Sequence, residues 1–150
     1  MNKMRIAMLL SCMFFSTSVF AEEALAKKFS DSQLIEMMKS EGYSSVDVIK
    51  EGVIRVKIDG SNFVMFNKFD GDLQLYYVIG GAKVSFENMN EWNKSKRLSR
   101  AYLDSDKDPT LEADLLADAG ITPSQVTTFF KVFKMSVSAF RDFIIERNDK

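Results

Sequence analysis

The stretch from Asp72 to Asp104, DLQLYYVIGGAKVSFENMNEWNKSKRLSRAYLD, decides the fold, because it passes from strand to helix and back to strand without a spacer. Its first part, up to Ile79, is rich in aromatic and aliphatic residues with a period of two, which predicts a strand. Ser85 can cap a helix that contains the only tryptophan, Trp92. From Arg100 the alternation returns and predicts a second strand.

Upstream of this stretch, the sequence predicts one helix and an antiparallel meander. A capping box that begins at Ser30 starts the helix at Asp31. Short alternating segments follow, and Asp59-Gly60 and Asp70-Gly71 are strong hairpin signals. The last strand of the meander, Leu73 to Ile79, is apolar on both faces, as expected for a strand that is covered on both sides or lies opposite a partner.

Downstream, the acidic turn from Asp104 to Pro109 begins like a calcium-binding loop. Pro109 stands where that loop needs glycine and Leu115 where it needs a bidentate glutamate, so we expect a hairpin turn and no metal site. The segment from Thr110 to Ala119 is composed of helix formers, which favours a short helix. A strand here would instead pair with Ser99 to Asp104 as a hairpin, and the residues alone leave both structures open.

The last element is a long amphipathic helix that starts with a capping box at Thr122 and Pro123 in the first position. Phe129 and Phe143 widen its apolar stripe, which favours packing across a sheet over a free coiled coil. We therefore expect a monomer or a weak homodimer. The stripe consists of Val126, Phe130, Phe133, Val137, Phe140 and Ile144.

The chain begins like an exported protein. Lys3 and Arg5 precede an apolar run from Ile6 to Phe20, and the run ends at Ala21 with the small residues of a signal-peptidase site. We predict a signal peptide over residues 1–21, cleavage after Ala21 and a periplasmic location, with no membrane span thereafter. Leu-Leu-Ser-Cys12 resembles a lipobox, so lipid attachment at Cys12 is one alternative to cleavage after Ala21. A retained membrane anchor is the other alternative.

Composition excludes several chemistries. The sequence contains no histidine, and its one cysteine, Cys12, lies in the predicted signal peptide, so Ser-His-Asp, Cys-His and zinc sites are excluded from the mature chain. We expect no enzyme and no cofactor. Loss of two basic residues with the signal lowers the net charge from −1 to −3, which argues against a nucleic-acid partner. The mature chain is long enough for one domain, over 29–147, between a short solvated leader (22–28) and a frayed tail (148–150).

Two roles are open for Trp92. On the predicted helix Phe86, Met89 and Asn93 share a face, with Asn90 and Trp92 on its flanks. The indole ring can lie on the sheet as a core residue, or it can contact a ligand. In the second role it would act with other polar and aromatic side chains on an extended peptide or a small polar ligand, and the candidate binding residues are Tyr77, Asn90, Trp92, Asn93 and Arg97.

Three motifs of the central stretch resemble the signature of the YbjN family, described as bacterial sensory transduction regulators. The motifs are Asp72-Leu-Gln-Leu-Tyr-Tyr77, Asn90-Glu-Trp-Asn93 with Arg97, and Ala101-Tyr-Leu-Asp104. The resemblance implies an α+β fold similar to type III secretion chaperones, in which a meander and a hairpin form one antiparallel sheet with an N-terminal, a short middle and a long C-terminal helix. It implies a strand at Thr110 to Asp118.

For function, we expect an exported protein-interaction or chaperone-like module that binds an unknown protein or peptide. The alternative is a small-ligand sensor with a pocket under the long last helix, recognisable by a concave apolar cavity next to Trp92. The exported leader departs from the cytoplasmic members of the family.

Overall fold

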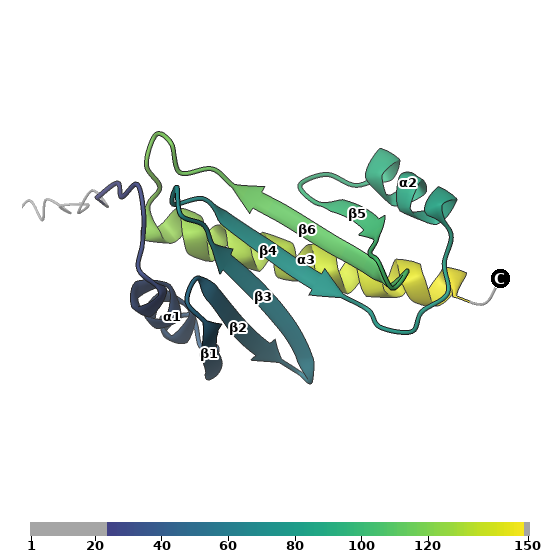
Figure 1. Cartoon of the computed structure of the whole chain (residues 1–150), viewed down its shortest axis with the longest axis horizontal. Helices are drawn as coiled ribbons and strands as arrows, with labels where there is room; N and C mark the ends of the chain where they lie inside the picture. The colour runs from purple at the N-terminus through teal and green to yellow at the C-terminus, as the bar shows by residue number, and fades with distance from the viewer. Residues whose placement is uncertain (1–23, 149–150) are drawn as a thin grey trace, which may run out of the picture.

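The computed structural model describes residues 24–148 (Figure 1). The predicted signal peptide and its cleavage site lie outside these residues. The elements are α1 (Asp31–Ser40), β1 (Ser45–Lys50), β2 (Val53–Ile58), β3 (Ser61–Asn67), β4 (Leu73–Val78), α2 (Phe86–Ser95), β5 (Arg100–Leu103), β6 (Pro109–Leu115) and α3 (Pro123–Arg147).

The six strands form one antiparallel sheet in the order β1-β2-β3-β4-β6-β5. Strands β1 to β4 are the predicted meander and β5-β6 the predicted hairpin, so the α+β architecture is confirmed. Because β6 lies between β4 and β5, the chain crosses through α2 to the edge of the sheet before it returns. The long helix α3 runs behind the sheet in Figure 1.

Local signals fix most of these boundaries. Ser30, Ser85 and Thr122 each accept a hydrogen bond from the third helical N–H, and all three helices have a complete capping box. At the turn between β2 and β3, Asp59 and Gly60 have φ of 48° and 79°, the left-handed pair that suits the twist of a two-residue hairpin.

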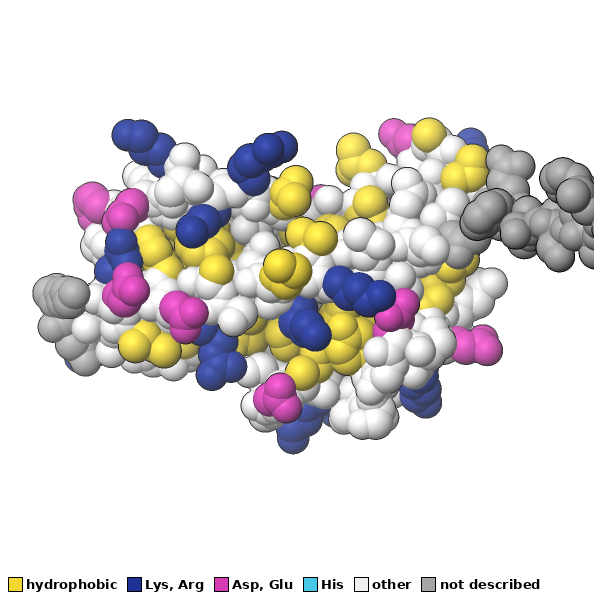
Figure 2. All heavy atoms as spheres, turned by 180° about the vertical axis from the view of Figure 1, so that it is seen from behind, with side chains coloured by type: hydrophobic (Ala, Val, Ile, Leu, Met, Phe, Trp, Pro, Cys, Tyr) yellow, Lys and Arg dark blue, Asp and Glu magenta, His cyan; other side chains and the backbone are white. Residues whose placement is uncertain are grey.

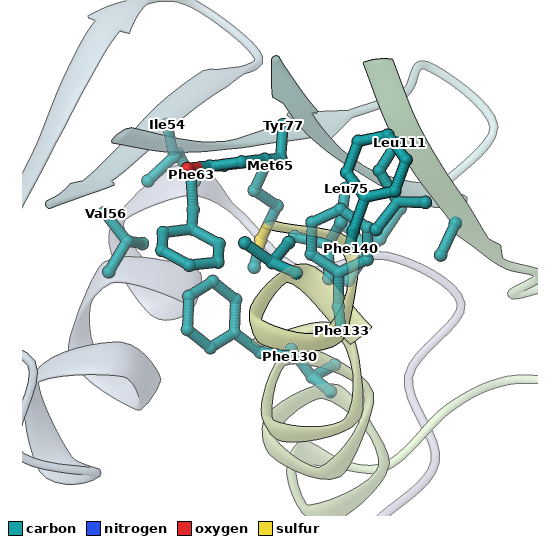
Figure 3. Packing of buried hydrophobic residues seen from close by; sticks show 14 of the residues in the cluster. Ile54, Val56, Phe63, Met65, Leu75, Tyr77, Leu111, Phe130, Phe133 and Phe140 are labelled. Carbon is teal, nitrogen blue, oxygen red and sulfur yellow. The ribbon is translucent and has the colours of Figure 1, made fainter. Parts of the chain in front are cut away.

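The core lies between α3 and one face of the sheet (Figure 3). The six predicted stripe residues of α3 are all buried, as is Phe143, which confirms that this helix packs on the sheet. Phe63 of β3 contacts Phe130 and Phe133 of α3, at ring-centroid distances of 5.7 and 6.4 Å. Tyr77 of β4 also faces this core, whereas Tyr76 beside it is only half-buried. Helix α3 therefore covers one face of β4. The opposite face, which carries Tyr76, is only partly buried, so β4 is not covered by helices on both sides.

Helix α2 buries Trp92 and only part of the face that Phe86, Met89 and Asn93 share. Met89 and Trp92 are buried, but Phe86 is 67% exposed, because the first residue of the helix points away from the core. Trp92 contacts Phe140 and Phe143, at centroid distances of 5.0 and 5.4 Å. Its place between α2 and α3 makes it part of the core.

Both ends of the domain are more closely attached than expected. Ala26 forms a β-bridge with Ile121, and Lys28 donates a hydrogen bond to the carbonyl of Phe69. Residues 26–28, which we call the strap, thus lie against the β6–α3 and β3–β4 connections. We had expected a solvated leader here. Asn148 caps α3 and accepts a hydrogen bond from the N–H of Lys83. Among residues 24–148, no helix combines the length and hydropathy needed to cross a bilayer.

Candidate functional site

The hairpin β5-β6 has arms of unequal length. Strand β5 begins at Arg100, opposite Glu112, whereas β6 continues to Leu115. Ala113 to Leu115 therefore pair with β4 on one side and, within residues 24–148, have no paired strand on the other. At a rise of about 3.3 Å per residue, this free edge is about 10 Å long.

A groove of about 670 Å³ runs beside this free edge. Helix α3 forms one wall through Phe129, Val132 and Phe133, and β6 forms the other. Leu98 and Ser99, which precede β5, close the end of the groove. Figure 2 shows the face that carries α3, where hydrophobic side chains remain exposed among Lys and Arg side chains. The groove thus combines an apolar wall with an incompletely paired strand.

Leu98 is held in an unfavourable conformation at the end of this groove. Its φ is 65°, in the left-handed region that bulky side chains avoid, at a cost of about 1 to 2 kcal/mol. Its side chain is nevertheless 69% exposed, so packing in the described structure does not offset that cost. Strained backbone of this kind is concentrated at functional sites.

A smaller hollow of about 280 Å³ adjoins the groove, and Val132 lines both. Lys96 and Arg97 lie on one side of this hollow, and Met135 and Ala139 of α3 on the other. The groove and the hollow together follow α3 from Ser124 to Ala139, which is about four turns.

The structure brings only two of the five predicted binding residues together. Trp92 and Arg97 both line the small hollow, although Trp92 is only 1% exposed. Tyr77 lies in the core, 5.3 Å from the ring of Phe63, and Asn90 is exposed on α2. Asn93 serves the fold: its side chain accepts from the N–H of Ala101 at 2.7 Å and donates to its carbonyl at 2.9 Å. It thereby occupies the outer edge of β5.

A buried carboxylate organises the sheet face next to the groove. Glu112 is 7% exposed and accepts hydrogen bonds from the guanidinium of Arg100 and, at 2.6 Å, from the hydroxyl of Tyr102. The hydrogen bond to Glu112 raises the pKa of Arg100. Burial, followed by the hydrogen bond and negative charge of Glu112, raises the pKa of Tyr102 above its usual range. The network holds Arg100 at the point where β5 begins.

Comparison with known proteins identifies the family. The model of the family described as "YbjN: Putative bacterial sensory transduction regulator" matches residues 30–146. The chain belongs to the YbjN family. A search among curated proteins finds no match.

The fold of this YbjN chain is similar to that of a type III secretion chaperone. It is similar to the Yersinia pestis chaperone SycH, solved in complex with a stable fragment of YscM2, with a TM-score of 0.53 and 16% identity. The similarity covers 73% of this chain and 98% of the SycH chain. At this identity the similarity concerns the fold.

The groove between α3 and β6 was not predicted; the small-ligand alternative expected a pocket under the last helix next to Trp92, where the smaller hollow lies. Its wall residue Phe129 was noted only as an extension of the apolar stripe of α3. The unequal lengths of the predicted strands, Ser99 to Asp104 against Thr110 to Asp118, were a signal for the free edge. The segment from Lys94 to Arg100 has four basic residues among two serines and one leucine, which was a signal for an exposed loop beside it.

Proposed function

We propose that this YbjN domain is a non-enzymatic binding module, which holds an extended segment of a partner protein in the groove between α3 and β6. The observation that carries the proposal is the free edge of Ala113 to Leu115 beside the apolar wall of α3. A segment in extended conformation would add a strand to the edge and place alternate side chains against Phe129 and Val132.

The SycH structure supports a binding role by analogy of fold, because that chaperone is in complex with a protein fragment. The groove also fits this role on physical grounds. Backbone hydrogen bonds would supply affinity for extended chains in general, and the apolar wall would select residues at every second position.

We also propose that the domain acts outside the cytoplasm. The charged, apolar and small-residue pattern of residues 1–21 supports export with cleavage after Ala21 and a periplasmic location. Mass analysis of the mature protein would then find Glu22 as its first residue. Retention of Met1, or a lipid on Cys12, contradicts this part of the proposal.

A small apolar ligand is the second candidate occupant. The volume of the groove, about 670 Å³, lies within the range of roughly 300 to 1,000 Å³ for small-molecule pockets. A small ligand would not need to form hydrogen bonds with the free strand edge. The two candidates therefore differ in whether the occupant bonds to the backbone of Ala113 to Leu115.

An NMR titration of the mature protein separates the two candidates. The probe is a capped peptide of alternating threonine and valine, which has no charge. We expect it to perturb the amides of Ala113 to Leu115 and to protect the amide of Asp114 from hydrogen exchange, because alternate residues of a strand face opposite neighbours and only Asp114 of the three directs its N–H to the free edge. The variant Val132→Lys places a charge in the groove and should abolish binding, whereas Ile145→Lys, on the same helix at a 71% exposed position outside the groove, should not.

Two outcomes contradict the peptide-binding function. One is the absence of any perturbation in the groove. The other is binding of the apolar dye anilinonaphthalene sulfonate that Val132→Lys removes, without any effect of the peptide on the edge amides. The second result favours the small-ligand sensor.

A further inference from the structure

The charges along the groove and the adjoining hollow are distributed unevenly. Asp114 lies in the groove wall, Arg100 at the start of β5, and Lys96 and Arg97 line the hollow beyond it. Arg100 forms an ion pair with Glu112, and the carboxylate of Asp114 lies 4.0 Å from the same guanidinium. The groove is thus acidic or neutral near Asp114, and the adjoining hollow is basic near Lys96.

Neither basic side chain at this end forms an ion pair within residues 24–148, although Glu91, Asp142 and Glu146 line a further hollow with Lys96. The ammonium of Lys96 contacts the ring of Trp92, at 5.7 Å. Both side chains are exposed. Because the mature chain is acidic overall, two adjacent basic residues beside an apolar groove favour an occupant with negative charge at that end.

The sheet also indicates a direction for the occupant. Every neighbouring pair of strands in it is antiparallel, which is the more stable pairing per residue. A segment antiparallel to β6 would enter near Leu115 and run past Ala113 toward the residues that precede β5. Its C-terminal end would therefore arrive at Ser99, whose hydroxyl has no hydrogen-bond partner in residues 24–148, and then at Arg97.

We infer that the groove selects an acidic partner segment: an extended stretch with apolar residues at alternate positions, followed on its C-terminal side by carboxylates that pair with Lys96 and Arg97. This inference rests on the proposed function and adds the charge and the direction of the occupant. The apolar residues face Phe129 and Val132, and the carboxylates give the segment its polarity.

Two capped peptides of identical composition test the inference. One has three Thr-Val pairs followed by three glutamates, and the other has the three glutamates first. Fluorescence anisotropy with the mature protein should show roughly tenfold tighter binding of the first peptide, since two exposed ion pairs contribute up to about 1 kcal/mol each. The difference should shrink as salt is added.

Matched variants locate the effect. Lys96→Gln/Arg97→Gln should remove the preference for the first peptide while it leaves binding of the uncharged Thr-Val peptide unchanged. Lys50→Gln/Lys57→Gln alters the net charge equally at the far end of the sheet, and should keep the preference.

The outcomes separate this inference from the function on which it rests. Equal binding of the two acidic peptides, with the uncharged peptide still bound in the groove, overturns the inference alone. No binding of any peptide in the groove overturns both. Binding to vesicles of anionic phospholipid that requires Lys96 and Arg97, without a preference between the peptides, also overturns the inference, because the basic residues would then serve a membrane surface.

Discussion

At the scale of single residues, two glycines show how the strap is accommodated. Gly71 has φ of 97°, and a Cβ built there would lie 2.0 Å from the carbonyl oxygen of Lys27. Gly60 has φ of 79°, but a Cβ there would have no neighbour within 4 Å. Both positions have left-handed backbone, but only at Gly71 would a side chain collide with the strap.

Replacing each glycine by alanine separates these two contributions. We expect Gly60→Ala to lower the free energy of unfolding by about 1 kcal/mol, the cost of left-handed backbone. Gly71→Ala should cost about 2 to 3 kcal/mol, because the collision with Lys27 displaces the strap. Urea unfolding measures both. Trypsin should cleave after Lys27 and Lys28 faster in Gly71→Ala only, and equal cleavage of the two variants would contradict a docked strap.

Tyr102 gives the fold a dependence on alkaline pH. Its pKa is raised in the folded state, mainly by burial and then by Glu112, so folding favours the neutral hydroxyl. The resulting stability is complete below the ordinary tyrosine pKa of about 10 and is lost as the pH rises toward the folded-state value. Tyr102→Phe should therefore be less stable than the wild type at pH 8, by about 1 kcal/mol for the lost hydrogen bond. The difference should shrink at pH 11, and a constant difference would exclude this linkage.

At the scale of elements, capping boxes and Asp-Gly turns could be predicted because each depends on a few adjacent residues. Strand β6 could not be predicted in this way. Its residues Leu111 to Leu115 include good helix formers, and they form a strand because β4 pairs with all of them and β5 pairs with Leu111 and Glu112. The groove was beyond sequence reasoning for a similar reason, since it depends on where β5 begins relative to β6 and on how α3 lies across the sheet.

Helix α3 itself is a sequence prediction that stability measurements can check. Phe133 is 1% exposed and packs against Phe63, so Phe133→Ala should lower the free energy of unfolding by about 3 to 5 kcal/mol. Met135, on the same helix, is 70% exposed, and Met135→Ala should change it by no more than about 0.5 kcal/mol. Similar losses for the two variants would contradict packing of this face on the sheet.

At the scale of the whole molecule, the sheet has two outer strands, and each limits pairing with another copy in its own way. Strand β1 has an irregular register between Val48 and Lys50, which interrupts its ladder. Strand β5 is closed by Asn93, whose amide takes the place of a neighbouring strand at Ala101. This closure disfavours association through backbone hydrogen bonds at β5, and the monomer or weak homodimer stays a prediction.

Removal of the Asn93 amide should therefore change the assembly as well as the stability. Asn93→Ala leaves the N–H and carbonyl of Ala101 without their partner, and we expect a loss of about 1 to 3 kcal/mol. Sedimentation velocity should show association that increases with protein concentration. Asn90→Ala, three residues earlier at an exposed position of the same helix, is the matched control and should sediment like the wild type. If Asn93→Ala is destabilised but sediments as the wild type at every concentration, then Asn93 contributes only to stability, and α2 rather than its amide keeps the edge from pairing.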